Sequence, residues 1–356
     1  MHNLCVTSGC FLFWIIMKLL HISLFAAILS GLVSCSNQGE SPSGNDSLND
    51  SVQTLTTINQ KILADPNNLE LYHTRARLHL GAKNYEAAIN DMDRIIQLDS
   101  AKSSWLLTAA DVNFFVGKVS KTEVLLKKAV QVDPKNVDCK LRLAQLHHYM
   151  KRFDEEVKLL DEVLLQDIHN AQAYFMKGMM FKELGDTTKA ISSMQTAVEQ
   201  EPDYYSAYIQ LGLLFAAKND PLAAQYYQNA LRVNPNSEEA LYNLGMFFQS
   251  VNELNPALDA YTRLLKINPE HFDANFNMGM LHAVKLGSDP KMVTKGMEYF
   301  AAAINADPKS PRAYYGRGYC FQRKGDVTNA EADYRKALEV DPQYTNAALA
   351  LEELGK

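Results

Sequence analysis

Apolar and small residues recur with a fixed period over most of this 356-residue chain. Within each period, apolar side chains fall at i, i+3, i+4 and i+7, the spacing of one face of a helix. Two such runs fill a period, separated by a polar turn such as Lys324-Gly325-Asp326. Most periods close on an acidic residue or an asparagine followed by proline, which disfavours helix in its predecessor. The pattern therefore predicts one pair of short helices written eight times, over residues 66–342.

The period is 34 residues, except for one interval of 33 and one of 39. The eighth position of each first helix is always small, so that the partner helix can approach closely. These residues are Ala76, Ala110, Ala144, Gly178, Gly212, Gly245, Gly279 and Gly318. A large side chain on the second helix is expected to fill the space; these are Met92, Leu126, Leu160, Met194, Tyr227, Tyr261, Phe300 and Tyr334. A second small position, on the second helices, is broken by Thr122 and Glu156.

A 34-residue helix–turn–helix period with these small and large positions resembles the tetratricopeptide repeat. The resemblance implies an all-α fold, an α-solenoid with a right-handed superhelix of eight units. Solenoids need caps on their terminal apolar faces. We assign these to an N-terminal helix over residues 51–65 and a C-terminal helix over residues 343–356. The extra residues of the 39-residue interval fall within 285–294 and are expected to lengthen the turn of the seventh unit.

In this family the first helices line a concave groove. Positions 5 and 9 of each first helix lie about one residue's rotation from the core stripe and are expected to face that groove. From the fourth unit onward these positions are apolar, and we predict that they bind a partner peptide or helix. They are Phe175, Met179, Ile209, Leu213, Tyr242, Met246, Phe276, Met280, Tyr315 and Tyr319. The alternative is that packing between neighbouring first helices uses up these side chains.

Position 6 carries an amide in three consecutive units, at Gln210, Asn243 and Asn277. Some members of the family hold a peptide backbone with asparagines at this position, so the three are added to the predicted surface. The charged clamp of members that bind chaperone tails needs Lys and Asn in the groove. Here aromatic residues take those positions, which argues against a chaperone C-terminus as ligand.

The first fifty residues have a different pattern. Met17-Lys18 precedes an apolar stretch of about 15 residues that fits a secretory signal and is short for a membrane span. Leu32-Val33-Ser34-Cys35 resembles the bacterial lipobox, in which the cysteine thiol is acylated and the chain is cut before it. We therefore predict a signal peptide over residues 1–34, with Met17 a possible true start, and a lipidated Cys35. Residues 35–50 are polar and acidic and are expected to form a flexible tether.

The lipobox implies a bacterial envelope protein anchored in the membrane by its lipid. Ser36, where an Asp would favour the inner membrane, points to the outer membrane facing the periplasm. The alternative is an uncleaved signal anchor that happens to contain a cysteine.

Charge and cysteine spacing argue against a nucleic-acid-binding protein and against a disulfide between the repeats. The net charge is −6, with no visible basic stripe, so we expect no nucleic-acid partner. Cys139 and Cys320 lie in distant units, too far apart for a disulfide, and are expected to be buried and free.

The sequence offers no catalytic constellation, metal ligands or cofactor motif. His147 and His148 are adjacent and point about 100° apart. His79, His147 and His282 share a normally aromatic position and are expected to pack between helices. We therefore predict a non-enzymatic scaffold, an assembly or accessory factor of a periplasmic or outer-membrane machine. The alternatives are a scaffold without a lipid, or an envelope protein with an unrecognised enzymatic or sugar-binding role.

Overall fold

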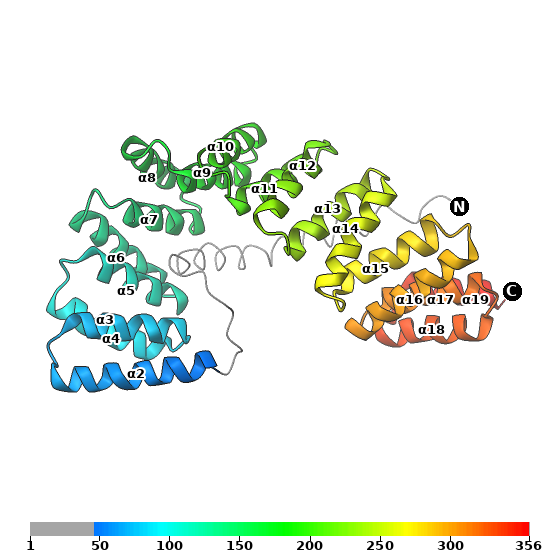
Figure 1. Ribbon diagram of the computed structural model, residues 1–356, viewed down its shortest axis with the longest axis horizontal. Helices are drawn as coiled ribbons and strands as arrows, with labels where there is room; N and C mark the ends of the chain where they lie inside the picture. The colour runs from blue at the N-terminus through cyan, green and yellow to red at the C-terminus, as the bar shows by residue number, and fades with distance from the viewer. Residues whose placement is uncertain (1–45, 356) are drawn as a thin grey trace. The chain divides into compact units, whose positions relative to one another are not determined.

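The computed structural model describes residues 46–355 (Figure 1), which contain eighteen α-helices, one five-residue π-helix and no strand. The predicted all-α solenoid is confirmed. The chain divides into two compact units, one ending at Gln97 and one running from Leu98 to the C-terminus. The described part of the first unit contains α2 (Asp46–Ala64), α3 (Leu69–Gly81) and most of α4 (Tyr85–Leu98).

The second unit holds the remaining seven helix pairs and a final helix. The first helices of these pairs are α5 (Ser103–Phe115), α7 (Val137–Tyr149), α9 (Ala171–Glu183), α11 (Tyr205–Ala216), α13 (Glu238–Ser250), α15 (Phe272–Met280) with η1 (Leu281–Lys285), and α17 (Pro311–Arg323). The second helices are α6 (Val119–Val132), α8 (Phe153–Gln166), α10 (Thr187–Gln200), α12 (Leu222–Val233), α14 (Leu254–Ile267), α16 (Pro290–Ala306) and α18 (Val327–Val340). The chain closes with α19 (Thr345–Leu354).

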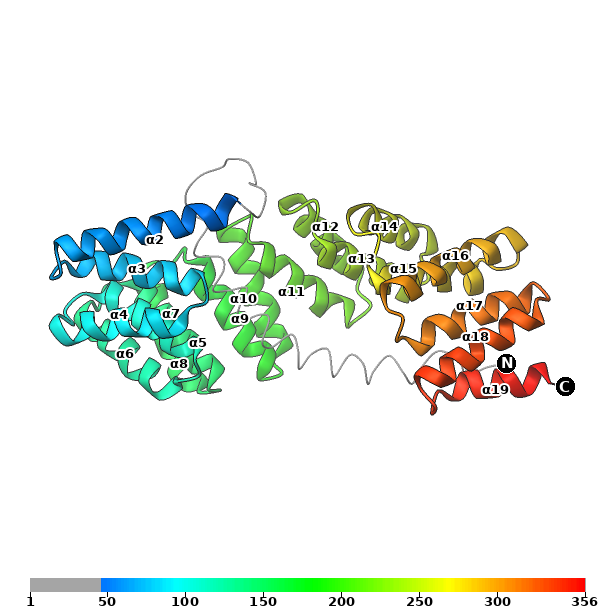
Figure 2. The same ribbon diagram turned by 90° about the horizontal axis from the view of Figure 1, so that it is seen from below.

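Within the second unit each helix packs against its neighbours in chain order, as Figures 1 and 2 show. The first helix of a pair also contacts the first helix of the next pair at four places, including α7 with α9 and α11 with α13. First helices therefore adjoin one another directly across these four repeat boundaries.

The turn inside a pair has the same backbone form in seven of the eight pairs. Its central residue has a positive φ, a conformation that glycine adopts without strain and other residues adopt less readily. Gly117, Gly185 and Gly325 fill it in three pairs, and Lys83, Lys151, Asn219 and Asn252 fill it in the others. The following amide bonds back five residues, as from Asp326 N to Phe321 O at 3.0 Å. This bond satisfies a carbonyl that the helix end would leave unpaired.

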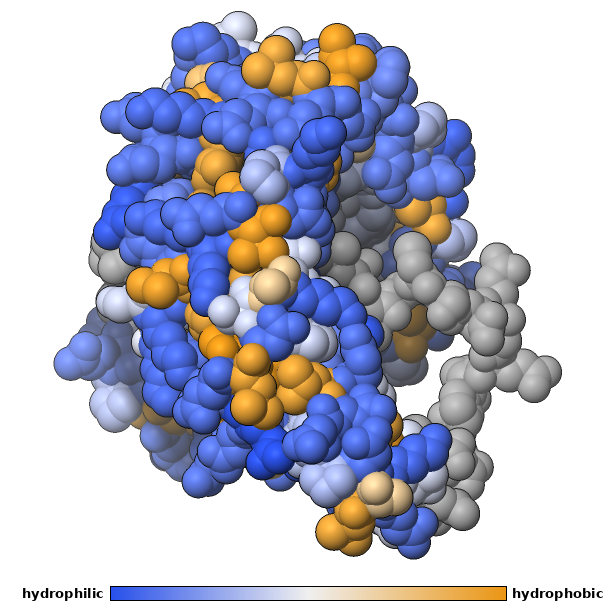
Figure 3. Space-filling model, turned by 90° about the vertical axis from the view of Figure 1, so that its left-hand side faces the viewer, coloured by the Kyte–Doolittle hydropathy of each residue, from blue (hydrophilic) through white to orange (hydrophobic). Residues whose placement is uncertain are grey.

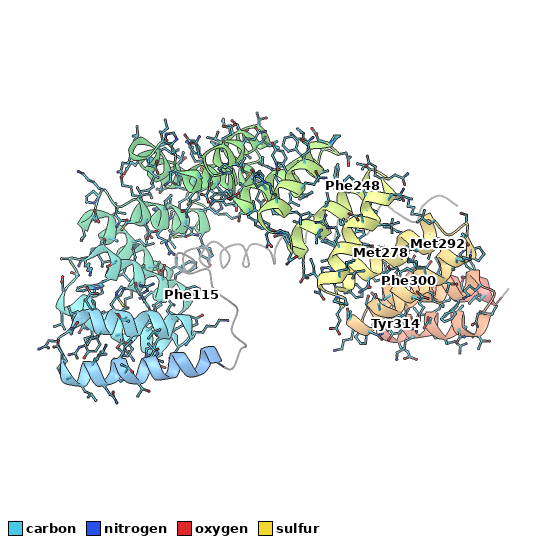
Figure 4. All side chains as sticks on the ribbon, viewed as in Figure 1. Phe115, Phe248, Met278, Met292, Phe300 and Tyr314 are labelled. Atoms are coloured by element: carbon cyan, nitrogen blue, oxygen red, sulfur yellow. The ribbon has the colours of Figure 1, made fainter. Side chains whose placement is uncertain are left out.

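The small and large positions meet as predicted. A Cβ added to Gly212 would lie 2.4 Å from a ring carbon of Tyr227, and one added to Gly318 would lie 2.8 Å from Tyr334. Both rings are fully buried. In Figure 4, the core residues Met278, Phe300 and Tyr314 lie between α15, α16 and α17. The close approach of each pair therefore depends on a missing side chain.

Two boundaries differ from the prediction. Helix α2 begins at Asp46, five residues before the predicted start of the N-terminal helix and within the segment predicted as a tether. Extending a formed helix adds one hydrogen bond for each residue fixed, so a helix can continue into a polar segment. In the seventh pair, the extra residues do not form one long loop. They are absorbed by the π-helix η1 and by α16, which has 17 residues, and leave only Leu286–Asp289 as a turn.

Candidate interaction surface

The predicted surface lies on α9, α11, α13, α15 and α17, and its ten apolar residues differ in exposure. Phe175 and Ile209 are both buried, at 2% exposed. Met246 is the most open, at 40%. The rest are half-buried: Met179, Leu213, Tyr242, Phe276, Met280, Tyr315 and Tyr319. Packing therefore uses up part of the predicted surface, and eight of its ten side chains keep some contact with solvent.

Three of the aromatic residues at position 5 pack in the same way. Each contacts the residue that caps the N-terminus of the next first helix. Phe175 lies 5.1 Å from Tyr204, Tyr242 lies 5.5 Å from His271, and Tyr315 lies 5.8 Å from Tyr344, measured between ring centroids. Ring pairs at these distances attract each other beyond the area that they bury. These aromatic residues therefore join consecutive repeats as well as facing the surface.

Phe276 has a different neighbour. The guanidinium of Arg312 lies over both Phe272 and Phe276, 4.6 Å from each ring centroid. The same guanidinium forms an ion pair with Asp273. Phe276 also meets the buried ring of Phe300 edge-on at 5.6 Å. Arg312 is thus engaged within the protein and does not present an unpaired charge to a ligand.

The three amides at position 6 are in unequal environments. Gln210 is buried, and its Oε1 accepts a hydrogen bond of 2.7 Å from Lys182 Nζ of the preceding repeat. Asn277 donates from Nδ2 to the hydroxyl of Tyr261, at 3.1 Å, and contacts Met246 Sδ at 3.2 Å. Asn243 is half-buried. Gln210 and Asn277 therefore stabilise contacts between helices in this structure.

A polar network on α5, α7, α8 and α9 was missed by the sequence reasoning. His148 contacts Glu156 through Nδ1 at 3.0 Å and Glu183 through Nε2 at 3.2 Å. Asp111 accepts from Arg142 of the next repeat at 3.1 Å. The one signal in the sequence was Glu156, a carboxylate at a position that is small in most repeats, and its side chain is fully buried.

Burial shapes the electrostatics of this network. It raises the pKa of Asp111 to about 6, against the opposing effect of Arg142. It also raises the pKa of Glu156, which the bond from His148 partly offsets. For His148, burial opposes the charged form, but the bonds to Glu156 and Glu183 outweigh it and raise the pKa to about 9. The imidazole is therefore charged at neutral pH.

Two further histidines and two cysteines within the described residues behave as packing residues. His147 and His282 are buried, and burial lowers the pKa of each. The ring of His282 stacks on Tyr299 at 5.5 Å. Cys139 and Cys320 are buried and free, as predicted, and burial raises their pKa to about 11 and about 12, so neither is a reactive thiolate at neutral pH.

Within residues 46–355 no group of three or more His, Cys, Asp or Glu side chains is arranged to hold a metal ion. A depression of about 390 Å³ lies at the turn between α7 and α8, and none of its lining residues belongs to the predicted surface. Lys151, Arg152, Asp154 and Glu155 are among its lining residues, with Leu184 from the next repeat. These charges are of mixed sign, and the depression suggests no reaction.

Exposed apolar residues elsewhere are scattered. The face shown in Figure 3 is mostly hydrophilic, with separate small apolar areas. Isolated exposed hydrophobic residues are normal on protein surfaces and do not mark a site. None of the described helices is both long and apolar enough to cross a bilayer. The predicted signal peptide over residues 1–34, the possible start at Met17 and the predicted lipidation site Cys35 lie outside the described residues.

Comparison with known proteins identifies the repeat. Sequence models of the tetratricopeptide repeat match residues 69–102, 171–204, 238–271 and 311–344. These segments coincide with four of the eight helix pairs, each extended to the start of the next pair.

Two relatives and one solved structure match over most of the chain. DnaJ homolog subfamily C member 7 homolog from Dictyostelium discoideum is 22% identical over 303 residues, covering 76% of this chain and 56% of the relative. DnaJ homolog subfamily C member 3 from Rattus norvegicus is 20% identical over 309 residues, covering 82% of this chain and 60% of the relative. The alignments thus span little more than half of these relatives.

The C-terminal part of a TPR repeat-containing protein from Cytophaga hutchinsonii has a similar structure, with a TM-score of 0.59 at 19% identity, covering 68% of this chain and 98% of that one. At this level of identity the likeness concerns the fold. Together with the four matched segments and the eight helix pairs, it shows that the chain carries tetratricopeptide repeats and folds as an all-α solenoid built from them.

Proposed function

We propose that the chain is a non-enzymatic scaffold that binds a partner peptide or helix across α11, α13, α15 and α17. Proteins with tetratricopeptide repeats bind peptide or protein partners, and this fold is typically a scaffold without catalytic activity. The observation that carries the proposal is the partial exposure of apolar side chains on consecutive first helices. Leu213, Met246, Met280 and Tyr319 all occupy position 9, and each keeps part of its surface accessible.

A mutational test of this surface needs a residue whose substitution leaves the fold intact. Tyr242 and Phe276 pack on buried rings, so a charge at either position would also disturb the fold. Met246 is 40% exposed, so covering its remaining apolar surface with a partner contributes about 1 kcal/mol, and an unpaired glutamate buried in its place would add a larger cost. Methionine is also unbranched and adaptable, which suits a surface that binds an apolar segment.

The experiment compares Met246→Glu with Val327→Glu in the full chain. Val327 is 49% exposed but lies at the start of the second helix α18. We expect the Val327→Glu variant to capture its partner from the native cells by crosslinking as the unchanged protein does. With Met246→Glu, the amount of captured partner should fall at least about tenfold, because a loss of about 1.4 kcal/mol in binding free energy is a tenfold loss of affinity. Equal capture by the two variants would reject this surface.

The scaffold is further proposed to be an envelope lipoprotein, held at the outer membrane and facing the periplasm by a lipid on Cys35, and to serve assembly of a periplasmic or outer-membrane machine. Its support is the lipobox-like Leu32–Cys35 sequence after an apolar stretch. Mass spectrometry of the mature chain should find an acylated N-terminus at Cys35, lost in Cys35→Ser and kept in Cys10→Ser. A membrane-bound chain with residues 1–34 intact would instead indicate a signal anchor.

A further inference from the structure

With both neighbouring carboxylates ionised, the contacts of His148 are satisfied by a doubly protonated imidazole. Its Nδ1 lies 3.0 and 3.1 Å from the two carboxylate oxygens of Glu156, and its Nε2 lies 3.2 Å from Glu183 Oε1. A neutral imidazole has one N–H, so it would turn an unprotonated nitrogen towards one of the two carboxylates. The cationic ring can donate to both.

This bridge links three helices across a repeat boundary. His148 is on α7, Glu156 is on α8 of the same repeat, and Glu183 is on α9 of the next. Glu156 is fully buried and His148 is 19% exposed, so solvent screens the contact little. Removing the charge from one member of such a buried group leaves the others uncompensated, which is strongly destabilising.

From this geometry we propose that His148 is a proton-dependent joint: its imidazolium holds the third repeat to the fourth, and loss of its proton loosens that boundary. The joint extends beyond the bridge itself. Lys182, next to Glu183 on α9, donates to Gln210 of α11 at 2.7 Å. A shift of α9 would therefore reach α11, whose surface belongs to the proposed binding region.

The charges around His148 come from the two elements that form the bridge. Glu156 faces it from α8 and Glu183 from α9, and both favour the imidazolium. On α6, Glu123 and Lys127 act on the neighbouring His147. On α9, Lys182 interacts with Glu183 and with Gln210. On α5, Asp111 pairs with Arg142, six residues from His148 on the same helix.

The sign of the effect follows from the direction of the shift. The folded-state pKa of His148 is raised to about 9, above an unfolded value of about 6.5. The bridge is therefore fully stabilising below about pH 6.5 and is lost as the pH rises through about 9. Over this window, opening of the joint should become about tenfold easier for each pH unit.

The test combines NMR with hydrogen exchange on the full chain. The ring carbons of His148, assigned by their absence in His148→Gln, should titrate near pH 9. Protection factors of amides in α7 and α9 should fall between pH 7 and 9, by about tenfold per unit. Amides of α17 and α18 serve as the internal control, because the Arg317–Asp333 pair at 2.8 Å relies on a guanidinium that stays charged.

The fall in protection should be absent in His148→Gln, which cannot titrate. If His148→Gln does not fold, Glu183→Gln retains the contact with Glu156, and the titration of His148 should then move to lower pH. A ring that titrates below pH 7 overturns the proposal. The proposal is also overturned if amide protection in His148→Gln falls with pH as it does in the unchanged protein. It is likewise overturned if the pKa of the His148 ring is the same in Glu183→Gln.

Discussion

At the scale of single residues, the eighth position of each first helix is matched to one side chain of its partner helix. Three repeats place alanine there, and the opposing residue is Met92, Leu126 or Leu160. Four of the five glycine repeats place an aromatic ring opposite. A Cβ added to any of these four glycines would lie only 2.4 to 2.9 Å from the nearest atoms of the opposing ring. Glycine at this position therefore provides the room that a ring needs in four repeats, and in the fourth repeat Gly178 makes the same room for Met194, 2.6 Å from an added Cβ.

Gly212 and Tyr227 give a direct test of this pairing. Gly212→Ala gains about 1 kcal/mol of helix propensity but forces overpacking that costs about 1–3 kcal/mol, so a net loss of stability is expected. In Gly212→Ala/Tyr227→Leu, which copies the alanine–leucine pair of the second repeat, the two changes should compensate by about 1–3 kcal/mol. Urea unfolding of both single variants and the double variant measures the coupling.

Gly355→Ala is the matched control, because its added Cβ would have nothing nearer than 3.7 Å. It should leave the unfolding midpoint nearly unchanged. Additive effects at Gly212 and Tyr227 would show that the helices adjust to the extra methyl, and that glycine is not required.

At the scale of elements, the seventh repeat departs from the common turn. The π-helix η1 ends with a bond from Leu286 N to Leu281 O at 2.9 Å, which leaves the carbonyls after Leu281 short of partners. Arg323 of α17 supplies the missing donors. Its Nη1 donates to Ala283 O at 3.0 Å and its Nη2 to Gly287 O at 2.6 Å. A side chain from the next repeat thus holds the inserted residues in place.

Arg323→Met should release this segment. Hydrogen bonds from charged groups contribute about 1.5–3 kcal/mol each when shielded, and because Arg323 is partly exposed we expect a total loss of about 1–2 kcal/mol. Hydrogen exchange should accelerate at residues 281–289 and remain unchanged in α13. Arg335→Met is the control, since its exposed pair with Glu331 is worth about 0.5 kcal/mol or less. Unaltered exchange at residues 281–289 would mean that packing of α16, rather than Arg323, orders the segment.

At the scale of the whole molecule, the repeat pattern was sufficient to predict the architecture, because each helix pair depends mainly on its own small and large residues. The exposure of the predicted surface was not predictable in the same way. Phe175 and Tyr242 each pack on the residue that caps the next first helix, 29 positions later. That contact depends on how one repeat stacks on another, which no single repeat encodes.

The polar network was hidden for a related reason. Glu156 could be recognised as a departure from the small-residue rule, but its partners His148 and Glu183 come from two different first helices. Contacts beyond a single repeat also matter at the C-terminal end of the stack. The apolar face of the last repeat needs a covering element that is not itself a full repeat.

Helix α19 is that element, and its removal provides a test at this scale. Ala347 and Ala350 are buried in a cluster with Tyr314, Ala330 and Tyr334, and Tyr344, Leu351 and Leu354 pack against it. Deleting residues 343–356 uncovers this face, so we expect the free energy of unfolding to fall by on the order of 3 kcal/mol, with loss of soluble protein as exposed apolar surface promotes association. Leu349→Lys is the control, because Leu349 is 53% exposed and should tolerate a charge. A shortened chain with the unfolding midpoint and solubility of the full chain would show that α17 and α18 need no cap.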